Sequence, residues 1–329
     1  MAKPILISGI QPTGRLHIGN YLGALKNFVE LQNSGKYECY FFIADLHSLT
    51  ENFSPQEKSK QILELAADYL ATGLDPKKSV IFLQSQVAAH SELAWIFETL
   101  TSLGELKRMT QFKEKSEKEK ERANAGLLTY PTLMAADILI YDAAFVPVGE
   151  DQLQHLELTR TLARKFNKRF GKTFVEPKPI LTESPRIMSI SDPKKKMAKS
   201  EPSGCLFLDD SPREIKAKIS RAVTDSGLEI KLDPEKKAGI SNLLRIYSSL
   251  IGHGIPMLEK KYHGKNYAEF KRDLAELVIN HFADFRKDKK ALMARPQTLV
   301  AVLKSGSNAA TKIAEKKIHE VKKKIGIAF

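Results

Sequence analysis

Cysteine and long apolar runs are scarce in this 329-residue chain. Its two cysteines, Cys39 and Cys205, lie in apolar stretches without a second cysteine or a histidine at metal-ligand spacing, so we expect reduced, partly buried thiols and no metal site. No run of about 18 apolar residues occurs, so we expect no transmembrane helix. The apolar residues 5–7 are too short a stretch for a signal peptide, so we expect a cytoplasmic protein without a membrane partner.

Negative charge is in the minority. The chain has 39 acidic residues against 52 basic ones, which gives a formal net charge of +13. Such an excess favours a polyanionic partner, because lysine and arginine contact phosphates and release counterions. Solubility alone would also explain the excess, so composition by itself leaves nucleic-acid binding open.

Apolar strand patterns alternate with helical patterns over the first half of the chain. We predict strands at residues 4–8, 38–44, 79–84 and 145–148 and helices at residues 20–32, 55–72, 91–103, 127–141 and 149–170. A capping box on Ser54 and Glu57, with Pro55 at the first helical position, marks one helix start. Strands that are apolar on both faces and separated by helices predict an α/β fold with a Rossmann-like parallel sheet.

Strand patterns nearly vanish after about residue 205. Helices are predicted at residues 212–222, 240–250, 267–285, 289–305 and 308–325, so we expect one domain at residues 1–205 and an α-helical second domain at residues 206–329. Residues 107–122 have seven basic and four acidic side chains, and we expect them to form an exposed, helical or partly mobile arm within an inserted helical segment near residues 105–141. The last helix combines an apolar stripe with six lysines, which indicates either a solvated face or RNA contact.

A glycine-rich turn follows the first predicted strand, where ligands bind in an open parallel sheet. Gly9, Gly14 and Gly19 let a ligand approach the backbone closely. The helix beginning near Asn20 offers free N–H groups to phosphate, and His17 can donate hydrogen bonds to its oxygens. The turn is not a usual phosphate loop, and a generic glycine turn is the alternative.

A lysine-rich loop, Asp-Pro-Lys-Lys-Lys-Met-Ala-Lys-Ser, occupies residues 192–200. Asp-Pro starts a turn, and Gly204 follows soon after. Lysines on a mobile loop suit a polyphosphate whose charge shifts during a reaction. A solvated basic loop or a localisation tag is the alternative.

Acidic residues mark two further positions. Glu150 and Asp151 follow the fourth predicted strand, where they either cap the next helix or bond ribose hydroxyls. Asp137 lies inside an apolar helix, with Tyr130 and Met134 on the same face. A buried carboxylate is costly unless paired, so Asp137 should pair either within the protein or with a donor of a ligand.

Together these segments resemble the class I aminoacyl-tRNA synthetases. Residues 17–20, His-Ile-Gly-Asn, resemble the HIGH motif, and residues 196–200, Lys-Met-Ala-Lys-Ser, resemble the KMSKS loop in the family's order and separation. Further strings resemble the tryptophanyl-tRNA synthetases within that class: residues 8–14, 104–116, 126–139, 147–160, 186–189 and 222–226. The resemblance covers nearly the whole chain and is weakest after about residue 285.

The resemblance implies a two-step reaction. Tryptophan and ATP give tryptophanyl-adenylate and pyrophosphate, and the tryptophanyl group then moves to tRNA(Trp), which needs positioning and charge stabilisation rather than a protein nucleophile. ATP is then a substrate with Mg²⁺ bound through its phosphates, and no permanent cofactor is expected. The resemblance also implies a homodimer with residues near 95–141 at the interface. Residues 206–329 would bind the tRNA anticodon, with part of residues 285–329 packing back on the catalytic domain.

The family pattern implies a role for individual residues. The predicted catalytic residues are His17, Lys115, Lys196 and Lys199, the three lysines stabilising the departing pyrophosphate. The predicted ATP-binding residues are Gln11, Pro12, Thr13, Gly14, Gly19, Asn20, Gly149, Glu150, Asp151, Ile187, Lys196, Met197, Ala198, Lys199 and Ser200, with residues 149–151 at the ribose and Ile187 and Met197 at adenine. The predicted tryptophan-binding residues are Asp137 at the indole N–H, Met134 and Val146 on the ring, and Tyr130 and Gln152 at the α-amino group.

Two residues depart from the signatures. Asn20 stands where HIGH has its second histidine, as is usual for the tryptophan and tyrosine enzymes. Ala198 replaces the first serine of KMSKS, which removes one hydroxyl but leaves both lysines, so we expect activity to survive.

Three alternatives compete with this interpretation. A tyrosyl-tRNA synthetase shares the fold and both signatures, but a phenol hydroxyl calls for a more polar pocket than the face with Met134 and Asp137. A small-molecule nucleotidyltransferase needs no helical, basic second half. A non-catalytic RNA-binding relative would not need Lys196, Lys199 and Asp137.

Overall fold

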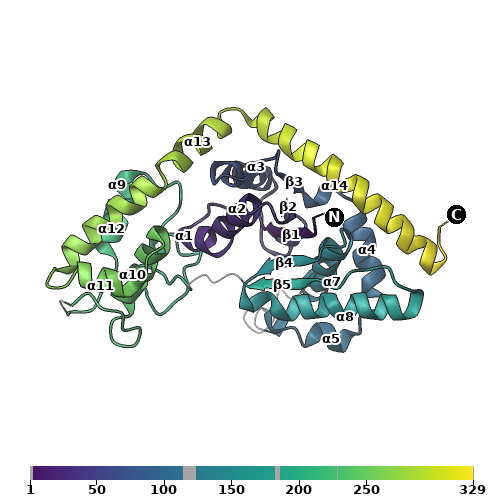
Figure 1. Cartoon of the computed structure of the whole chain (residues 1–329), viewed down its shortest axis with the longest axis horizontal. Helices are drawn as coiled ribbons and strands as arrows, with labels where there is room; N and C mark the ends of the chain where they lie inside the picture. The colour runs from purple at the N-terminus through teal and green to yellow at the C-terminus, as the bar shows by residue number, and fades with distance from the viewer. Residues whose placement is uncertain (1–2, 114–123, 182–185, 228, 329) are drawn as a thin grey trace.

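The computed structural model describes residues 3–113, 124–181, 186–227 and 229–328. These residues contain a five-stranded parallel sheet with the strand order β3-β2-β1-β4-β5 (Figure 1). The strands are β1 (Ile5–Ile10), β2 (Glu38–Ile43), β3 (Ser79–Leu83), β4 (Phe145–Val148) and β5 (Lys178–Leu181). The predicted Rossmann-like sheet is confirmed. The pattern missed β5, because this short edge strand is mostly exposed.

Helices surround the sheet and continue beyond it. The first group comprises α1 (Ile18–Asn20), α2 (Lys26–Asn33), α3 (Pro55–Ala71), α4 (Ala89–Glu98), α5 (Leu103–Lys107), α7 (Ala125–Leu139) and α8 (Leu153–Phe170), with a π-helical turn (Tyr21–Leu25) between α1 and α2. The second comprises α9 (Pro212–Arg221), α10 (Ala238–Ile251), α11 (Ile255–Lys261), α12 (Tyr267–His281), α13 (Ala283–Met293) and α14 (Pro296–Ile325). None of the helices in the described ranges is long and apolar enough to cross a membrane.

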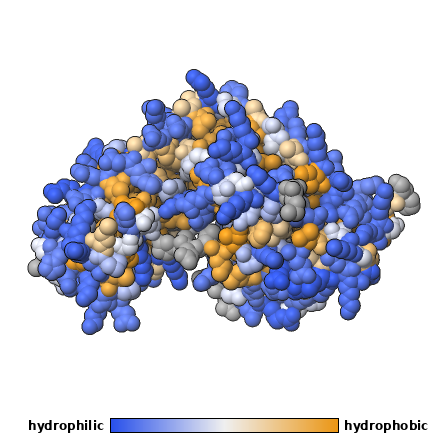
Figure 2. Space-filling model, viewed as in Figure 1, coloured by the Kyte–Doolittle hydropathy of each residue, from blue (hydrophilic) through white to orange (hydrophobic). Residues whose placement is uncertain are grey.

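The central strands bury side chains on both faces of the sheet. Leu6 and Phe41 belong to the core cluster under α2 and α3, while Ile7 and Tyr40 belong to the cluster under α4, α7 and α8. This two-sided burial explains why the strands read as nearly continuous apolar runs. The outer face that Figure 2 shows is mostly hydrophilic, in keeping with a chain in which 28% of residues are charged.

The predicted capping box at the start of α3 is wrong. Pro55 does begin the helix, but the Ser54 side chain makes no capping bond. The Ser54 hydroxyl donates to Gln56 Oε1 over 2.9 Å instead. Proline at the first helical position already fixes the backbone for the helix, so the start does not depend on the cap.

The long helix α14 lies along the edge strand β3. The sequence predicted two helices separated near residues 306–307, but α14 is one helix of 30 residues. Gly306 sits so close to β3 that an added Cβ would lie 1.9 Å from the Ile81 carbonyl oxygen. Ser307 Oγ accepts the edge N–H of Leu83 over 3.3 Å. Gly306 therefore permits close packing that covers a sheet edge, rather than breaking the helix.

The predicted helix boundary between α12 and α13 is also wrong. Residues 267–285 were predicted as one helix, but α12 ends at His281 and α13 begins at Ala283, with the buried Phe282 at the junction. Figure 1 shows α13 and α14 running from the group α9–α12 back along the sheet domain. After the helices α9–α12, the chain thus returns to the sheet.

Candidate active site

His17 caps the helix that follows β1. Its Nδ1 accepts hydrogen bonds from the backbone N–H groups of Gly19 (3.1 Å) and Asn20 (3.3 Å), and Asn20 Oδ1 accepts the N–H of His17 (3.1 Å). The Ile18 N–H donates to Leu206 O over 2.8 Å. The free N–H groups predicted for this helix start are therefore already bonded, which corrects the sequence-based interpretation.

The same contacts determine what His17 can offer a ligand. Because Nδ1 is an acceptor, the proton of the neutral ring is on Nε2, which leaves one N–H to donate. Burial, with the nearby charges of Lys199 and Lys196, lowers the pKa of His17 to about 4. The imidazole is therefore neutral at physiological pH and acts as a donor without a positive charge.

Lys199 brings the lysine-rich loop to the glycine-rich turn. Its Nζ lies 3.1 Å from both Thr13 Oγ1 and Gly14 O. Burial lowers the pKa of Lys199 to about 8. Lys196, in the same loop, is exposed. The two predicted phosphate-binding segments thus meet at the carboxyl end of β1.

Backbone bonds hold the two segments together. Leu16 and Ile18 pair with the strand-like segment after the loop, through Leu208 N–H to Leu16 O (3.0 Å) and Ile18 N–H to Leu206 O (2.8 Å). Within the loop, the Met197 N–H donates to Ile187 O over 3.2 Å. The side chains of Met197 and Ile187 are both buried, and a Cβ at Gly19 would lie 3.6 Å from that of Ile187.

A cavity of about 320 Å³ opens beside the turn, between the ends of β1 and β4 and helix α7. It brings together every residue predicted to bind tryptophan, together with two predicted to bind ATP: Tyr130, Met134, Asp137, Val146, Gln152, Gln11 and Gly149. Gly9 also lines the cavity, and an added Cβ there would lie 2.6 Å from the Phe42 ring. Glycine at this position therefore allows β1 to pass the ring.

Asp137 is buried at the cavity with three donors around it. Its Oδ2 lies 2.7 Å from His47 Nε2, and its Oδ1 lies 2.8 Å from Gln84 Nε2 and 2.5 Å from His90 Nδ1. Burial opposes its ionisation, but the charges and hydrogen bonds of His47 and His90 outweigh burial and hold the pKa of Asp137 below its ordinary value. The carboxylate therefore stays ionised at 1% exposure.

Tyr130 and Gln152, two other polar residues of the cavity, are also paired. The Tyr130 hydroxyl donates to Gln111 Oε1 over 3.1 Å and lies 2.6 Å from His155 Nε2. Burial lowers the pKa of His155 to about 4, so this ring is neutral. Gln152 Nε2 donates to Asp151 Oδ2 over 2.9 Å. These bonds fix the two side chains that were predicted to hold an α-amino group.

Comparison with known proteins decides the family. A family model described as tRNA synthetases class I (W and Y) matches residues 1–283. The chain belongs to this family. It is 51% identical over 325 residues to a Tryptophan--tRNA ligase of Caldanaerobacter subterraneus subsp. tengcongensis, covering 98% of each chain. It is 47% identical over 328 residues to one of Bacillus subtilis, covering 99% of this chain and 98% of the relative.

Solved structures support the same family. A tryptophanyl-tRNA synthetase from Mycoplasma pneumoniae is 35% identical with a TM-score of 0.88, covering 99% of this chain and 98% of that one. One from Campylobacter jejuni, complexed with ADP and tryptophan, is 37% identical with a TM-score of 0.84, covering 98% and 99%. The resemblance to class I synthetases predicted from the sequence is confirmed.

Not every predicted site residue of this family member has a contact in the cavity. Lys115 lies outside the described residues. Glu150 and Asp151 are exposed and lie inside a short 3-10 turn (Glu150–Gln152) that begins after Gly149. Helix α8 follows that turn with Gln152 as its N-cap residue, so neither carboxylate caps a helix. Ala198 contributes its backbone, because its carbonyl oxygen accepts the thiol of Cys205 over 3.1 Å. The predicted ATP residues not yet placed are Pro12, which is buried, and Ser200, which is exposed.

Three residues that contact Asp137 were not predicted from the sequence. His47, Gln84 and His90 form its hydrogen-bonding shell. A signal was available, since His47 and Gln84 follow β2 and β3 at the same sheet edge as the glycine-rich turn. His90 gave no such signal, because it lies in the first turn of an apolar helix.

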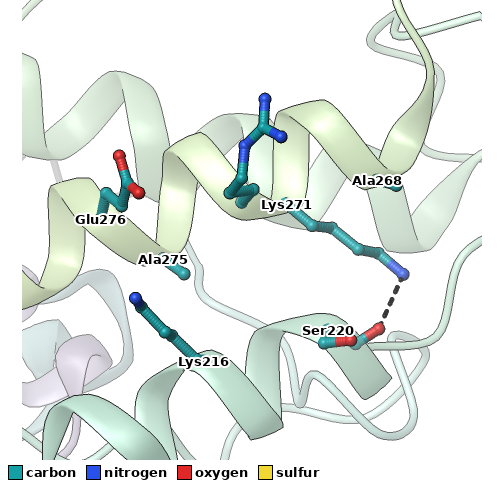
Figure 3. A pocket seen from close by; sticks show the side chains of 7 residues that line it. Lys216, Ser220, Ala268, Lys271, Ala275 and Glu276 are labelled. Atoms are coloured by element: carbon teal, nitrogen blue, oxygen red, sulfur yellow. Dashed lines mark hydrogen bonds between the residues drawn. The ribbon is translucent and has the colours of Figure 1, made fainter.

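A separate hollow of about 470 Å³ lies between α9 and α12 (Figure 3). Lys216, Lys271 and Arg272 line it, with Glu276 as the acidic member. Lys271 Nζ donates to the carbonyl oxygens of Ser220 (3.4 Å) and Ala222 (2.8 Å) at the end of α9. The hollow is thus mainly basic. It contains none of the predicted site residues.

Proposed function

We propose that the chain is a tryptophan–tRNA ligase, which activates L-tryptophan with ATP to tryptophanyl-adenylate and pyrophosphate and then transfers tryptophan to tRNA(Trp). One observation carries the proposal: the five side chains expected to bind tryptophan line a single cavity. Relatives named Tryptophan--tRNA ligase that are 45% to 51% identical over nearly the full length support the same amino acid. The tyrosyl-tRNA synthetase from Aeropyrum pernix shares 20% identity, which speaks for the fold alone.

Asp137 supplies the acceptor that an indole N–H requires. A carboxylate offers roughly four lone-pair sites, and three donors occupy Asp137. One site on Oδ2 remains for the indole nitrogen, and Met134 and Val146 line the cavity where the ring packs. A polar group left unpaired here would cost binding energy, so the pocket selects a ligand with a matching donor.

The rest of the amino acid lies toward the glycine-rich turn. Tyr130 and Gln152 hold the α-amino group, which directs the α-carboxylate toward Gln11 at the cavity wall. One carboxylate oxygen attacks the α-phosphorus of ATP, and the bond to the β-phosphate oxygen breaks with release of pyrophosphate. No proton needs to be removed from the nucleophile, so positioning and charge stabilisation are the protein's main contributions.

The phosphates lie where the two signature segments meet. Lys199 contacts Thr13 and Gly14 there, and His17 offers its Nε2 proton. Lys196 and Lys115 complete the positive charge that the departing pyrophosphate requires. Mg²⁺ would bind through the phosphates. We assign residues 149–151 to the ribose and Ile187 and Met197 to adenine, since Ile187 lies beside Gly19 and bonds the backbone of Met197.

The tRNA partner accounts for the excess of positive charge. The mainly basic hollow between α9 and α12 lies in the region proposed to bind the anticodon, residues 206–329. Phosphate contacts from lysine and arginine are the usual source of affinity for RNA. Because tRNA charging takes place where tRNA is available, we place the protein in the cytoplasm.

We also propose a homodimer formed through the residues around Trp95. Trp95 (67% exposed) and Leu49 (48% exposed) are large apolar side chains on this face, and Leu103 (64% exposed) lies within the range of residues predicted at the interface. Leu49 and Trp95 share one hollow with Thr129 and Leu133 of α7. Apolar exposure of this kind is typical of an interface between protein chains.

The test of the proposed function is charging of total tRNA by the purified full-length chain. Each radiolabelled amino acid is supplied in turn with ATP and Mg²⁺. We expect label to become acid-precipitable with tryptophan alone and to be released by mild alkali, as an aminoacyl ester is. Charging with tyrosine, or with none of the amino acids, would overturn the proposal.

A further inference from the structure

Lys289 is a buried lysine on α13, far in sequence from both signature segments. Its residue exposure is 8%, and its Nζ lies 2.7 Å from Asp68 Oδ1 and 2.9 Å from Asp209 Oδ2. Asp68 is in α3, beside the sheet, and Asp209 is in the segment between the lysine-rich loop and α9. One ammonium group therefore joins three parts of the chain.

Asp209 connects this ammonium group to the turn that carries His17. Lys289 holds Asp209 Oδ2, while Asp209 Oδ1 accepts a hydrogen bond from Arg15 Nε over 2.8 Å. Arg15 also donates to Asp210 Oδ1 over 2.9 Å, and its guanidinium carbon lies 4.3 Å from the centre of the Phe207 ring. The ion pairs thus form one continuous bridge from Asp68 to Arg15.

This bridge of ion pairs reaches residues 205–209, the segment that contacts the lysine-rich loop. Residues 206–208 pair with residues 16–18 through two backbone hydrogen bonds of 2.8 Å and 3.0 Å. The preceding Cys205 thiol donates to Ala198 O, one residue before Lys199. A shift of this segment would therefore move both Lys199 and His17.

A contribution to the stability of the fold does not by itself explain the buried ion pair of Lys289 and Asp68. Burial raises the pKa of Asp68 to about 6, and the Lys289 charge opposes this rise. Replacing a buried ion pair with apolar side chains is often neutral or stabilising, because desolvation offsets the attraction. What apolar side chains would not supply is a directed contact to Asp209.

We propose that Lys289 is a positioning residue, which acts through Asp209 and Arg15 to hold the lysine-rich loop (residues 192–200) against the glycine-rich turn. Lys289 touches no reacting atom. It also lies close enough to Lys199 for its charge to add to burial in lowering the pKa of Lys199, while Asp68 opposes that effect. The bridge links the helical region that would bind tRNA to the site of adenylate formation, so its role in catalysis rests on the proposed function.

The decisive variant is the double substitution Lys289→Met with Asp68→Asn. Lys289→Met alone would leave Asp68 buried without a cation, and unfolding would obscure the result. In the double variant no charge is left unpaired, because Asp209 retains Arg15. Lys289→Arg is the rescue variant, since a guanidinium can bridge both carboxylates. Lys290→Met is the matched control, because Lys290 is the exposed neighbour on α13.

The first readout is amide hydrogen exchange followed by mass spectrometry, which does not depend on the reaction that the protein catalyses. We expect residues 186–210 to exchange faster in the double variant than in the wild type. Strands β1 and β2 should exchange at the wild-type rate. Lys290→Met should match the wild type, and Lys289→Arg should recover most of the protection. Unchanged exchange in residues 186–210 of the double variant would overturn the proposal, whatever amino acid the enzyme uses.

The second readout is tryptophan-dependent pyrophosphate exchange, normalised to folded protein. A merely structural role would lower the rate in proportion to the active fraction and leave the KM values unchanged. Misplacement of the loop should instead lower kcat/KM for ATP by about tenfold or more per folded molecule while the KM for tryptophan stays within about twofold, since a misplacement of about 1 Å can cost on the order of 100-fold in rate. A wild-type kcat/KM for ATP per folded molecule in the double variant would contradict the positioning role.

Discussion

Lys199 Nζ donates to Thr13 Oγ1 over 3.1 Å, although 186 positions separate the two residues in the chain. Thr13 lies in the turn after β1, and Lys199 lies in the loop that folds back onto that turn. The contact places an ammonium group at the carboxyl end of a parallel sheet, where nucleotides bind in such folds. Thr13 and Gly14 hold this group at the place where we propose that the ATP phosphates bind.

The ionisation of Lys199 should be visible in the pH profile. Its pKa is lowered to about 8, mainly by burial, and only the protonated form stabilises phosphate charge. Because the proton is lost as pH rises, kcat/KM for ATP in pyrophosphate exchange should fall through about pH 8. Lys199→Arg keeps a cation at every accessible pH, so its profile should lack this fall. The same fall in Lys199→Arg as in the wild type would assign the titration to another group. Lys194→Arg, on the exposed part of the loop, is the control.

Asp137→Asn should weaken tryptophan binding specifically. The variant keeps the size of the side chain but lacks the negative charge that an indole N–H favours. A hydrogen bond to a charged group contributes about 1.5–3 kcal/mol, so we expect the KM for tryptophan to rise by about 10- to 100-fold with an unchanged KM for ATP. The wild type should also reject 3-benzothienylalanine, in which sulfur replaces the indole N–H, more strongly than the variant does. Equal discrimination by both proteins would remove Asp137 from the indole site.

The same substitution should change stability in a pH-dependent way. The pKa of Asp137 lies below its ordinary value of 3.8 because His47 and His90 outweigh burial. A carboxylate with a depressed folded-state pKa stabilises the fold above its unfolded-state pKa and loses that contribution as pH falls through the folded-state pKa. The stability difference between wild type and Asp137→Asn should therefore be largest above about pH 4 and shrink in more acidic solution, as followed by urea denaturation. A difference that grows on acidification would contradict this origin.

Trp95 should report on the proposed dimer. It is the single tryptophan of the chain and is 67% exposed in the isolated protomer. Burial in an interface would shift its fluorescence to shorter wavelength, and dilution below the dimer dissociation constant would reverse the shift. Trp95→Lys should sediment as a monomer, whereas Val300→Lys, at an apolar residue 51% exposed on α14, should remain a dimer. Dimeric Trp95→Lys would place the interface elsewhere.

Gly306→Ala should destabilise the fold, although alanine favours helices. The new Cβ would lie 1.9 Å from Ile81 O, so α14 would have to move away from the edge strand. Overpacking of this kind costs about 1–3 kcal/mol, which exceeds the gain of about 1 kcal/mol in helix propensity. Ser305→Ala, at the exposed neighbouring position, should instead be neutral or slightly stabilising. A urea midpoint that rises for Gly306→Ala would show that α14 does not press on β3.

Local patterns were sufficient to predict four of the five strands and most helices, whereas the exposed edge strand β5 gave no pattern. Strands such as residues 38–43 are apolar on both faces, and Pro55 marks a helix start by its fixed backbone geometry. Gly306 misled the prediction because glycine in a helix is read as a break, whereas its reason is contact with Ile81, more than 200 residues away. A sequence pattern does not contain such distant contacts.

For the candidate site, the sequence identified residues that line one cavity but not the contacts that hold them there. Asp137 stood out as a carboxylate in an apolar helix, and the family resemblance assigned it a ligand, but its shell of His47, Gln84 and His90 depends on how β2, β3 and α4 meet. The helix start after His17 was expected to present free N–H groups, yet the His17 ring itself accepts two of them. In both cases the sequence singled out the residue but not the hydrogen-bond partners that the structure gives it.

Pyrophosphate exchange into ATP, measured with each amino acid in turn, tests the central claim most directly. It isolates adenylate formation from tRNA, so it depends on the cavity at Asp137 and on the meeting of Lys199 with the turn at Thr13. The account predicts label in ATP when L-tryptophan is present and only background label with tyrosine or any other amino acid. Exchange that depends on tyrosine would contradict the assignment of the pocket, and exchange with no amino acid would contradict the assignment of an enzyme.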